Sequence, residues 1–259
     1  MNPAPALSSI EVRHQTPVRS NPARLLYPSA ALLLFVLMLL GFQQFYLHGK
    51  GYPSHPLAPP VKLLIIAHGV AMTGWVLLFL VQPLLIVSGN RRVHMALGRI
   101  GAVLAACIVV LGLRLPIQTT RFEPDVMLWG LDRRHFMAIP MISILLFGAF
   151  VAVGVWQRRR PEIHRPMMLL ATLSIIAAAT DRITGLPDLF AASMGGRLFG
   201  PFFPALVVGA VFLAVKSVLT RSYDRWFAAG YAVLVVAWAC IMKLAASQPW
   251  EQFAAFLVR

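Results

Sequence analysis

The sequence predicts an all-α integral membrane protein, and three observations support this fold class. Of the 259 residues, 59% are hydrophobic and only 12% are charged, and the mean hydropathy is +0.74. Several apolar runs reach about 18 residues or more, the length that crosses a hydrocarbon core of about 30 Å as a helix. The charged residues cluster between these runs. Long apolar runs of this kind are typical of membrane proteins, so we expect a bundle of transmembrane helices.

We expect seven transmembrane helices, preceded by a flexible cytoplasmic tail at residues 1–24 that is polar and rich in proline. Residues 25–259 would then form one seven-span domain. The first apolar run is too long for the core of a typical signal peptide, and no A-x-A-like cleavage site follows it, so we interpret it as an uncleaved span. A charged stretch over 114–134 predicts a loop between the third and fourth spans. The expected spans are 25–46, 61–87, 97–115, 135–156, 166–184, 199–219 and 226–246.

The formal net charge of +14 does not indicate a nucleic-acid partner, because the basic residues lie in short clusters between apolar runs. Such clusters set the orientation of membrane proteins, and the side that holds more of them faces the cytoplasm. If the N-terminus is inside, the inner segments hold 13 of the 23 basic residues and only three of the nine acidic ones. This distribution predicts a cytoplasmic N-terminus and an outside C-terminus. The inner basic residues are Arg13, Arg19, Arg24, Arg91, Arg92, Arg99, Arg158, Arg159, Arg160, Arg165, Lys216, Arg221 and Arg225.

Four histidines are the most informative polar residues, since a polar side chain in a membrane helix is costly and often functional. His68 lies about two turns into the second span. His94, His135 and His164 lie at the start of the third, fourth and fifth spans. Four consecutive spans therefore carry one histidine each. In the predicted orientation, His68 and His135 lie toward the outside, and His94 and His164 lie toward the inside.

Small residues accompany these histidines. Gly98, Gly101 and Ala105 share one face of the third span, and we expect this face to approach a neighbouring helix closely. A small face often serves only helix–helix packing. It also leaves room for a flat cofactor such as a porphyrin, held between axial imidazoles from two helices. Steps of seven along the second span place three further residues on one stripe: His68, Trp75 and Gln82.

Three segments of the second to fifth spans carry recognisable motifs. The first runs from His68 through Trp75 to the Q-P-L that begins at Gln82, and the second is RRVHMALGRIGAVLAACIVVLGL from Arg91. The third, RRRPEIHRPMMLLATLSIIAAATDRITG from Arg158, combines H-R-x-M at a helix entry with a later arginine. With these motifs the chain resembles a widespread family of uncharacterised bacterial multi-pass membrane proteins. The resemblance implies a bacterial plasma (inner) membrane location, and it makes a four-helix bundle of spans two to five the expected functional core.

More distantly, the chain resembles the ascorbate-type two-haem transmembrane cytochromes b. The AHGVAMTGW around His68 is similar to the first ligand segment of that family, and RRVHMALGRIGAVLA around His94 is similar to the second. His135 and His164 correspond by helix position. In that family the second and fourth helices ligate one haem, and the third and fifth ligate the other. The resemblance therefore implies haem b between His68 and His135 toward the outside, and between His94 and His164 toward the inside.

Three functions remain open at this point. The first is transmembrane electron transport by a b-type haem protein, with a quinol or a small anionic reductant received near Arg114, Arg121 and Arg182. The second is a cofactor-free accessory or structural subunit, whose partners are the lipid bilayer and other membrane subunits. The third is a zinc-dependent seven-span membrane hydrolase, because histidines and a carboxylate can hold zinc with an open position for water. The residues for such a zinc site are His48, His55, His68, His135 and Asp181.

Overall fold

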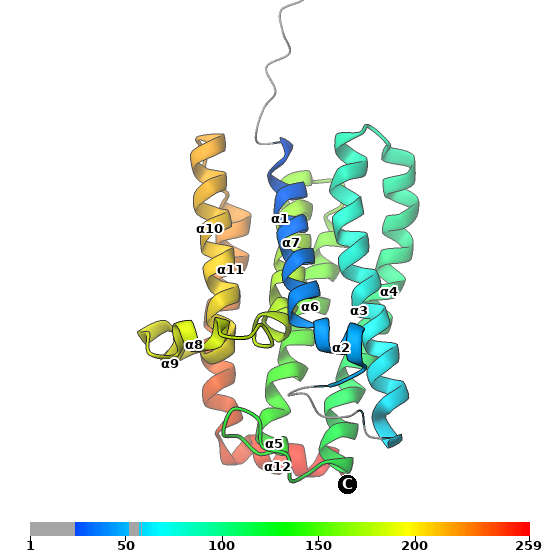
Figure 1. Cartoon of the computed structure of the whole chain (residues 1–259). Coiled ribbons are helices and arrows are strands. Elements are labelled where there is room, and N and C mark those ends of the chain that lie inside the picture. The colour runs from blue at the N-terminus through cyan, green and yellow to red at the C-terminus, as the bar shows by residue number, and fades with distance from the viewer. Residues whose placement is uncertain (1–23, 52–56, 58) are drawn as a thin grey trace, which may run out of the picture.

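The computed structural model describes residues 24–51, 57 and 59–259, and within these ranges the regular structure is helical (Figure 1). The predicted tail at 1–24 lies outside the described residues except for Arg24. Six helical stretches in the described part are long and apolar enough to cross a membrane. The prediction of an all-helical multi-pass membrane protein is therefore confirmed. The six stretches are Pro59–Val87, Arg91–Phe122, Arg133–Trp156, Pro161–Thr180, Met194–Thr220 and Arg225–Ala245.

The first expected span, 25–46, forms two helices instead of one. Helix α1 (Leu26–Gly41) has 16 residues, and after a break at Phe42 the chain continues as α2 (Gln43–His48). A helix of this length is about 24 Å long, which is shorter than a hydrocarbon core of about 30 Å. The two glutamines that follow Phe42 end the apolar run. Six of the seven expected spans thus correspond to helices long and apolar enough to cross a membrane. The first corresponds to α1, which is a shorter apolar helix.

Helices α3 (Pro59–Val87) and α4 (Arg91–Phe122) form a hairpin. The connecting turn contains Gly89 at a φ of 79°, and the Asn90 side chain accepts a hydrogen bond from the backbone N–H of Val93, which caps α4. Helix α4 continues through Phe122, so the predicted end of the third span at 115 is too early, and the loop predicted over 114–134 is present only at residues 123–132. The apolar pattern marks only the segment suited to lipid, whereas backbone hydrogen bonds carry the helix on into polar sequence.

The remaining helices pack around α7, and 78% of its most apolar 18-residue window is buried. Helix α7 contacts α1, α6, α10 and α11, while α3, α4 and α6 contact one another in sequence order. Helix α1 packs on both α3 and α7, so the described structure does not show spans two to five as a separate four-helix bundle. The remaining elements are α5 (Arg133–Phe136), α6 (Ala138–Trp156), α7 (Pro161–Thr180), α8 (Leu186–Ala191), α9 (Met194–Phe199), η2 (Gly200–Phe202), α10 (Phe203–Thr220), α11 (Arg225–Ala245) and α12 (Gln248–Leu257).

The turns between α3 and α4, between α6 and α7, and between α10 and α11 lie at one end of the bundle, which we call the basic end (top of Figure 1). The start of α1 lies there too, since Lys216 of α10 donates a hydrogen bond to the Tyr27 hydroxyl at 2.7 Å. Helices α5 and α12 lie at the opposite, far end. The expected inner basic clusters that the structure describes, from Arg24 onward, therefore lie on one side of the bundle, while Arg13 and Arg19 lie outside the described residues. Their assignment to the cytoplasm stays a prediction.

The helices differ in length, and this difference creates space at the far end. Helices α3 and α4 have 29 and 32 residues, or about 43 and 48 Å, whereas α7 has 20 residues, or about 30 Å. Helix α1 ends beside the end of α7, because a Cβ atom added at Gly41 would lie 2.2 Å from the backbone oxygen of Ala179. The far parts of α3 and α4 thus continue beyond α1 and α7 and leave a hollow between them.

Candidate functional site

The stripe predicted on the second span faces the protein interior. Trp75 of α3 is buried, and its indole N–H donates to the Thr172 hydroxyl of α7 at 3.2 Å. The Gln82 side chain donates to the backbone oxygen of His94 at 3.3 Å. The Trp75 ring also meets Phe147 of α6 edge-on, with ring centroids 4.8 Å apart. Trp75 and Phe147 form a packed layer, with His68 on the far side of Trp75 along α3 and Gln82 on the basic side.

His94 and His164 come together at the basic end, and we call them the basic-end histidine pair. Their ring centroids are 6.4 Å apart and the ring planes are nearly perpendicular, at 89°. Nδ1 of His164 lies 2.8 Å from the backbone oxygen of Gly154. A carbonyl can only accept, so this contact places the proton on Nδ1 and leaves the lone pair on Nε2. The described structure thus juxtaposes the two rings, while their role as ligands stays a prediction.

Unsatisfied polar atoms gather beside this pair. Nδ1 of His94 and Oε1 of Gln82 are both buried and have no hydrogen-bond partner in the described part of the chain. Leaving such an atom without a partner typically costs about 1–3 kcal/mol. Both atoms therefore have hydrogen-bonding capacity left at this site, beside the entry of α4.

The small face of α4 packs against α3, as we expected. Gly101 and Ala105 are buried. A Cβ atom added at Gly101 would lie 2.5 Å from a methyl carbon of Leu78. At Gly98 the nearest atom is the Gln82 amide nitrogen, at 3.8 Å. The prediction of close helix approach is therefore confirmed, and the packing is tightest at Gly101.

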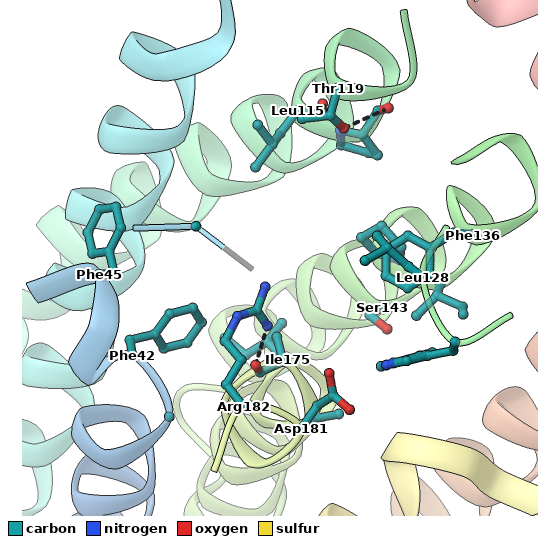
Figure 2. Close-up of a pocket in the computed structure, with 18 of the residues that line it drawn as sticks. Phe42, Phe45, Leu115, Thr119, Leu128, Phe136, Ser143, Ile175, Asp181 and Arg182 are labelled. Carbon is teal, nitrogen blue, oxygen red and sulfur yellow. Dashed lines mark hydrogen bonds between the residues drawn. The ribbon is translucent and has the colours of Figure 1, made fainter. Parts of the chain in front are cut away.

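The hollow at the far end is a cavity of about 620 Å³, which we call the far-end cavity. This volume falls within the roughly 300–1,000 Å³ of small-molecule sites. Figure 2 shows Ser143, Asp181 and Arg182 around one open space, with Phe42 and Phe45 to one side and Leu128 and Phe136 to the other. Further lining residues include Ile65, His68, Gly112, Leu115, Trp129, Ile144, Ser174, Ala178 and Phe202.

Three polar side-chain atoms at this cavity are buried without a hydrogen-bond partner in the described chain: Nδ1 of His68, Oγ of Ser143 and Nε of Arg133. The Arg133 guanidinium pairs with Glu123 through another nitrogen. The Arg182 guanidinium donates to the backbone oxygen of Ala178 and lies 5.0 Å from the centre of the Phe42 ring. Of these three side chains, Arg133 has a charged partner, whereas no ion pair to His68 or Ser143 is found in the described part of the chain.

The structure does not join His68 to His135, which was the predicted outer pair. Nδ1 of His135 lies 2.8 Å from the Asp132 carboxylate, whose other oxygen accepts the backbone N–H of His135 at 2.9 Å and caps α5. Partial burial acts to raise the pKa of Asp132, but the hydrogen bonds and charge of His135 outweigh it and hold this pKa below its ordinary value. In the described chain no hydrogen bond or ring contact links the His68 and His135 imidazoles, and His135 is not a cavity-lining residue.

The other predicted site residues are scattered. Of the three arginines expected to receive a reductant, only Arg182 lines the cavity, while Arg121 donates to the backbone oxygen of Val258 at 3.2 Å. His48 is exposed at the end of α2, and His55 lies outside the described residues. Among the residues that the structure describes, no three histidine, cysteine or acidic side chains group as a metal site would require.

Ser143 is the residue that our sequence reasoning missed. It is a single hydroxyl in the apolar run AIPMISILLFGAF, and a lone polar residue in such a run is a signal that could have identified it. Its position opposite His68 depends on how α6 packs against α3 and α4, which the sequence does not show.

No known protein family, curated protein or solved structure matches the chain. The fold and the two interior sites define an integral, multi-pass helical membrane protein.

Proposed function

We propose that this membrane protein is a transmembrane electron carrier that binds one b-type haem between His94 and His164. The observation that carries the proposal is the separation of the two rings. Two metal–imidazole bonds of about 2 Å place the nitrogens about 4 Å apart, and the ring centroids, each about 1 Å further back, about 6 Å apart. The measured centroid distance is 6.4 Å. The resemblance to two-haem cytochromes b implies that imidazoles from two different helices would hold the haem.

The donor set of the basic-end histidine pair fits an iron porphyrin. The bond from His164 to Gly154 is the kind of support that fixes the tautomer of a metal-binding histidine and aims its other nitrogen. The His94 ring has a buried nitrogen, Nδ1, that has no hydrogen-bond partner among the described residues. Haem, when bound, would supply a one-electron redox centre.

The polypeptide would set the conditions of electron transfer at this site. Gln82, by its bond to the His94 backbone, holds the entry of α4 against α3. Arg165 follows His164 directly, and Arg91 and Arg92 lie in the same turn as His94. Positive charge and burial near an iron site are among the factors that set its potential. The position at the basic end favours electron exchange with a partner on that side of the membrane.

The second haem that the resemblance implies, between His68 and His135, lacks comparable support because these rings are not joined. The zinc hydrolase is supported less than haem, since the described residues hold no three-ligand group. A cofactor-free accessory subunit is the alternative that the experiment must distinguish.

The test is a reduced-minus-oxidised absorption spectrum of the protein purified from cells supplied with a haem precursor. We expect a b-type difference spectrum in the wild type, and its loss in both His94→Ala and His164→Ala. Variants His48→Ala and His135→Ala serve as matched controls and should keep the spectrum. Added imidazole should restore it in His94→Gly, because a free ligand can replace the missing ring.

Two results would contradict the proposal. One is a wild type that contains no haem although the precursor is supplied and the protein is monodisperse. The other is a haem spectrum that survives the loss of both His94 and His164. The first result would favour the accessory subunit, and the second would require other ligands.

A further inference from the structure

Of the three side-chain atoms at the far-end cavity that have no hydrogen-bond partner in the described chain, two belong to the long helices α3 and α6, and the third is Nε of the paired Arg133. Ser143 of α6 is only 9% exposed, and neither its hydroxyl nor Nδ1 of His68 on α3 has a partner in the described chain. Both residues line the same cavity. The other serine of the cavity wall, Ser174, donates to the backbone oxygen of Ala171 and is satisfied. His68 and Ser143 thus have hydrogen-bonding capacity left for a ligand, as does Nε of Arg133, whose guanidinium is already paired with Glu123.

Gly112 of α4 keeps these two groups within reach of one space. A Cβ atom added at Gly112 would lie 3.2 Å from Cε1 of His68 and 2.6 Å from a side-chain carbon of Ile144, the residue after Ser143. Because Gly112 has no side chain, the His68 imidazole of α3 and the turn of α6 that carries Ser143 can both pack close to α4 at this point.

The surroundings of the two groups are apolar and aromatic. Phe42, Leu115, Phe136 and Ile175 line the cavity around the space onto which Ser143 opens (Figure 2). Aromatic and aliphatic walls with a few placed polar groups are typical of sites for small organic molecules. Flat rings fit such walls well, because aromatic side chains favour stacked or edge-on ring contacts.

The charged residues of the lining balance one another. Three are basic and three are acidic, and Glu123 pairs with Arg133. The site therefore has no net charge that would select an ion over a neutral molecule. The six residues are Lys50, Arg133, Arg182, Glu123, Asp181 and Asp188.

We propose that the far-end cavity binds a neutral molecule of one or two rings that carries a hydroxyl or carbonyl oxygen, and that this oxygen bonds to Ser143 and His68. The ring would occupy the aromatic space between the ends of α1 and α7 and the far parts of α3, α4 and α6. This site is separated from the basic-end histidine pair by the Trp75–Phe147 layer and does not depend on haem.

The test compares 2-naphthol with naphthalene, which has the same rings without the oxygen. Binding is measured by equilibrium dialysis against the full-length protein in lipid nanodiscs, with empty nanodiscs as the correction for partition into lipid. The wild type should bind 2-naphthol saturably, at one molecule per chain. Loss of one neutral hydrogen bond in Ser143→Ala should weaken naphthol binding by roughly 3- to 10-fold. Naphthalene binding should change less than about twofold.

Ser217→Ala is the matched control. Ser217 of α10 donates to the backbone oxygen of Leu213 and is not a cavity-lining residue, so its loss should leave both affinities unchanged. His68→Leu, with a side chain of similar size, should weaken naphthol binding as Ser143→Ala does. This second variant keeps the proposal testable if one of the two proteins is poorly folded.

Several outcomes would overturn the proposal. They are the absence of saturable naphthol binding, an equal loss of naphthol and naphthalene in Ser143→Ala, or an effect of Ser217→Ala as large as that of Ser143→Ala. A porphyrin that copurifies with the wild type, and that is lost in His68→Leu but kept in His94→Ala, would show that the cavity holds haem instead.

Discussion

Polar side chains inside apolar helices need hydrogen-bond partners, and the described residues meet this need in two ways. Thr172 accepts a bond from Trp75, and hydroxyls such as Thr120 and Ser174 donate to carbonyls of their own helix. Both arrangements are structural. The buried atoms left over belong mostly to the two candidate sites, which is why we assign them to ligands. Nothing in the structure explains the unpartnered indole nitrogen of Trp238, which stacks on Phe202.

Glycines differ in what surrounds them, and three α-helical glycines allow a graded prediction. At Gly41 an added Cβ atom would meet the backbone of Ala179 at 2.2 Å, which cannot move without shifting α7. At Gly101 it would meet a flexible end of Leu78 at 2.5 Å, and at Gly74 an ordinary contact at 3.5 Å. We expect Gly41→Ala to destabilise the protein by about 1–3 kcal/mol through overpacking. Thermal unfolding in detergent, followed by circular dichroism, measures the effect.

Substitutions at the other two glycines, Gly74 and Gly101, serve as controls for that prediction. Gly74→Ala should be neutral or stabilising by up to about 1 kcal/mol, since alanine favours a helix interior. Gly101→Ala should fall between the two, whereas Gly101→Leu should destabilise by about 1–3 kcal/mol. If Gly41→Ala melted at the wild-type temperature, α1 and α7 would not approach each other as the structure has them.

Among the elements, the turn between α10 and α11 connects three helices. Asp224 caps α11 by accepting the backbone N–H groups of Trp226 and Phe227, and its other oxygen pairs with Lys216 of α10. Lys216 also donates to Tyr27 at the start of α1. One carboxylate thus joins two helices through its own bonds and a third through the lysine. This arrangement fixes the start of α1 at the basic end, although α1 alone is short for a span.

We predict that Asp224→Ala destabilises the protein by about 3–5 kcal/mol, because it removes a cap and leaves the largely buried Lys216 without its countercharge. The side chains of Lys216 and Asp224 are only 16% and 9% exposed. The double variant Lys216→Met/Asp224→Ala should recover part of this loss, since no unpaired charge remains. Thermal unfolding of the purified proteins measures both effects.

The matched control, Asp125→Ala, changes an exposed loop aspartate, and its free energy of unfolding should stay within about 0.5 kcal/mol of the wild type. Equal melting temperatures for Asp224→Ala and Asp125→Ala would contradict the assigned role.

For the whole molecule, the apolar pattern predicted the helices well and their ends poorly. The expected span 226–246 differs by one residue at each end from α11, because an aspartate cap and a change of composition bound it. The length of α4 was underestimated because hydropathy marks only the residues suited to lipid. A helix continues for as long as its backbone groups are hydrogen-bonded. The division of the first run at Phe42 coincides with the two glutamines that follow it, whereas the close packing of Gly41 beside α7 has no signal in the sequence.

The two candidate sites also differ in how well the sequence predicts them. His94 and His164 could be predicted as a pair, since each lies at the start of its helix and both helices start at the same end. The far-end cavity could not be predicted, because it arises from unequal helix lengths and from loops distant in sequence. His135 was expected to pair with His68 on helix position alone, and no contact between their rings is found among the described residues. Its aspartate neighbour three residues earlier, which holds the ring, was visible in the sequence.

The described chain starts at the basic end and finishes at the far end (Figure 1). Helix α3 begins at the far end, because it runs to the turn at Gly89. The chain must therefore cross the bundle between Tyr27 and Pro59, whatever the length of α1. The described chain therefore starts and finishes at opposite ends of the bundle, and the density of basic residues predicts that the basic end is cytoplasmic.

Single cysteines in a background without Cys107 and Cys240 test this topology in the intact protein. We expect Ser88→Cys and Arg159→Cys, at the basic end, to react with a membrane-impermeant maleimide only after bacterial spheroplasts are permeabilised. Asp125→Cys and Arg259→Cys, at the far end, should react in intact spheroplasts, because these positions would face the outside. The reversed labelling pattern would refute the charge-based orientation while keeping the bundle. Labelling of Ser88→Cys and Asp125→Cys from the same side would refute the crossing of α4 itself, and with it the membrane fold described above.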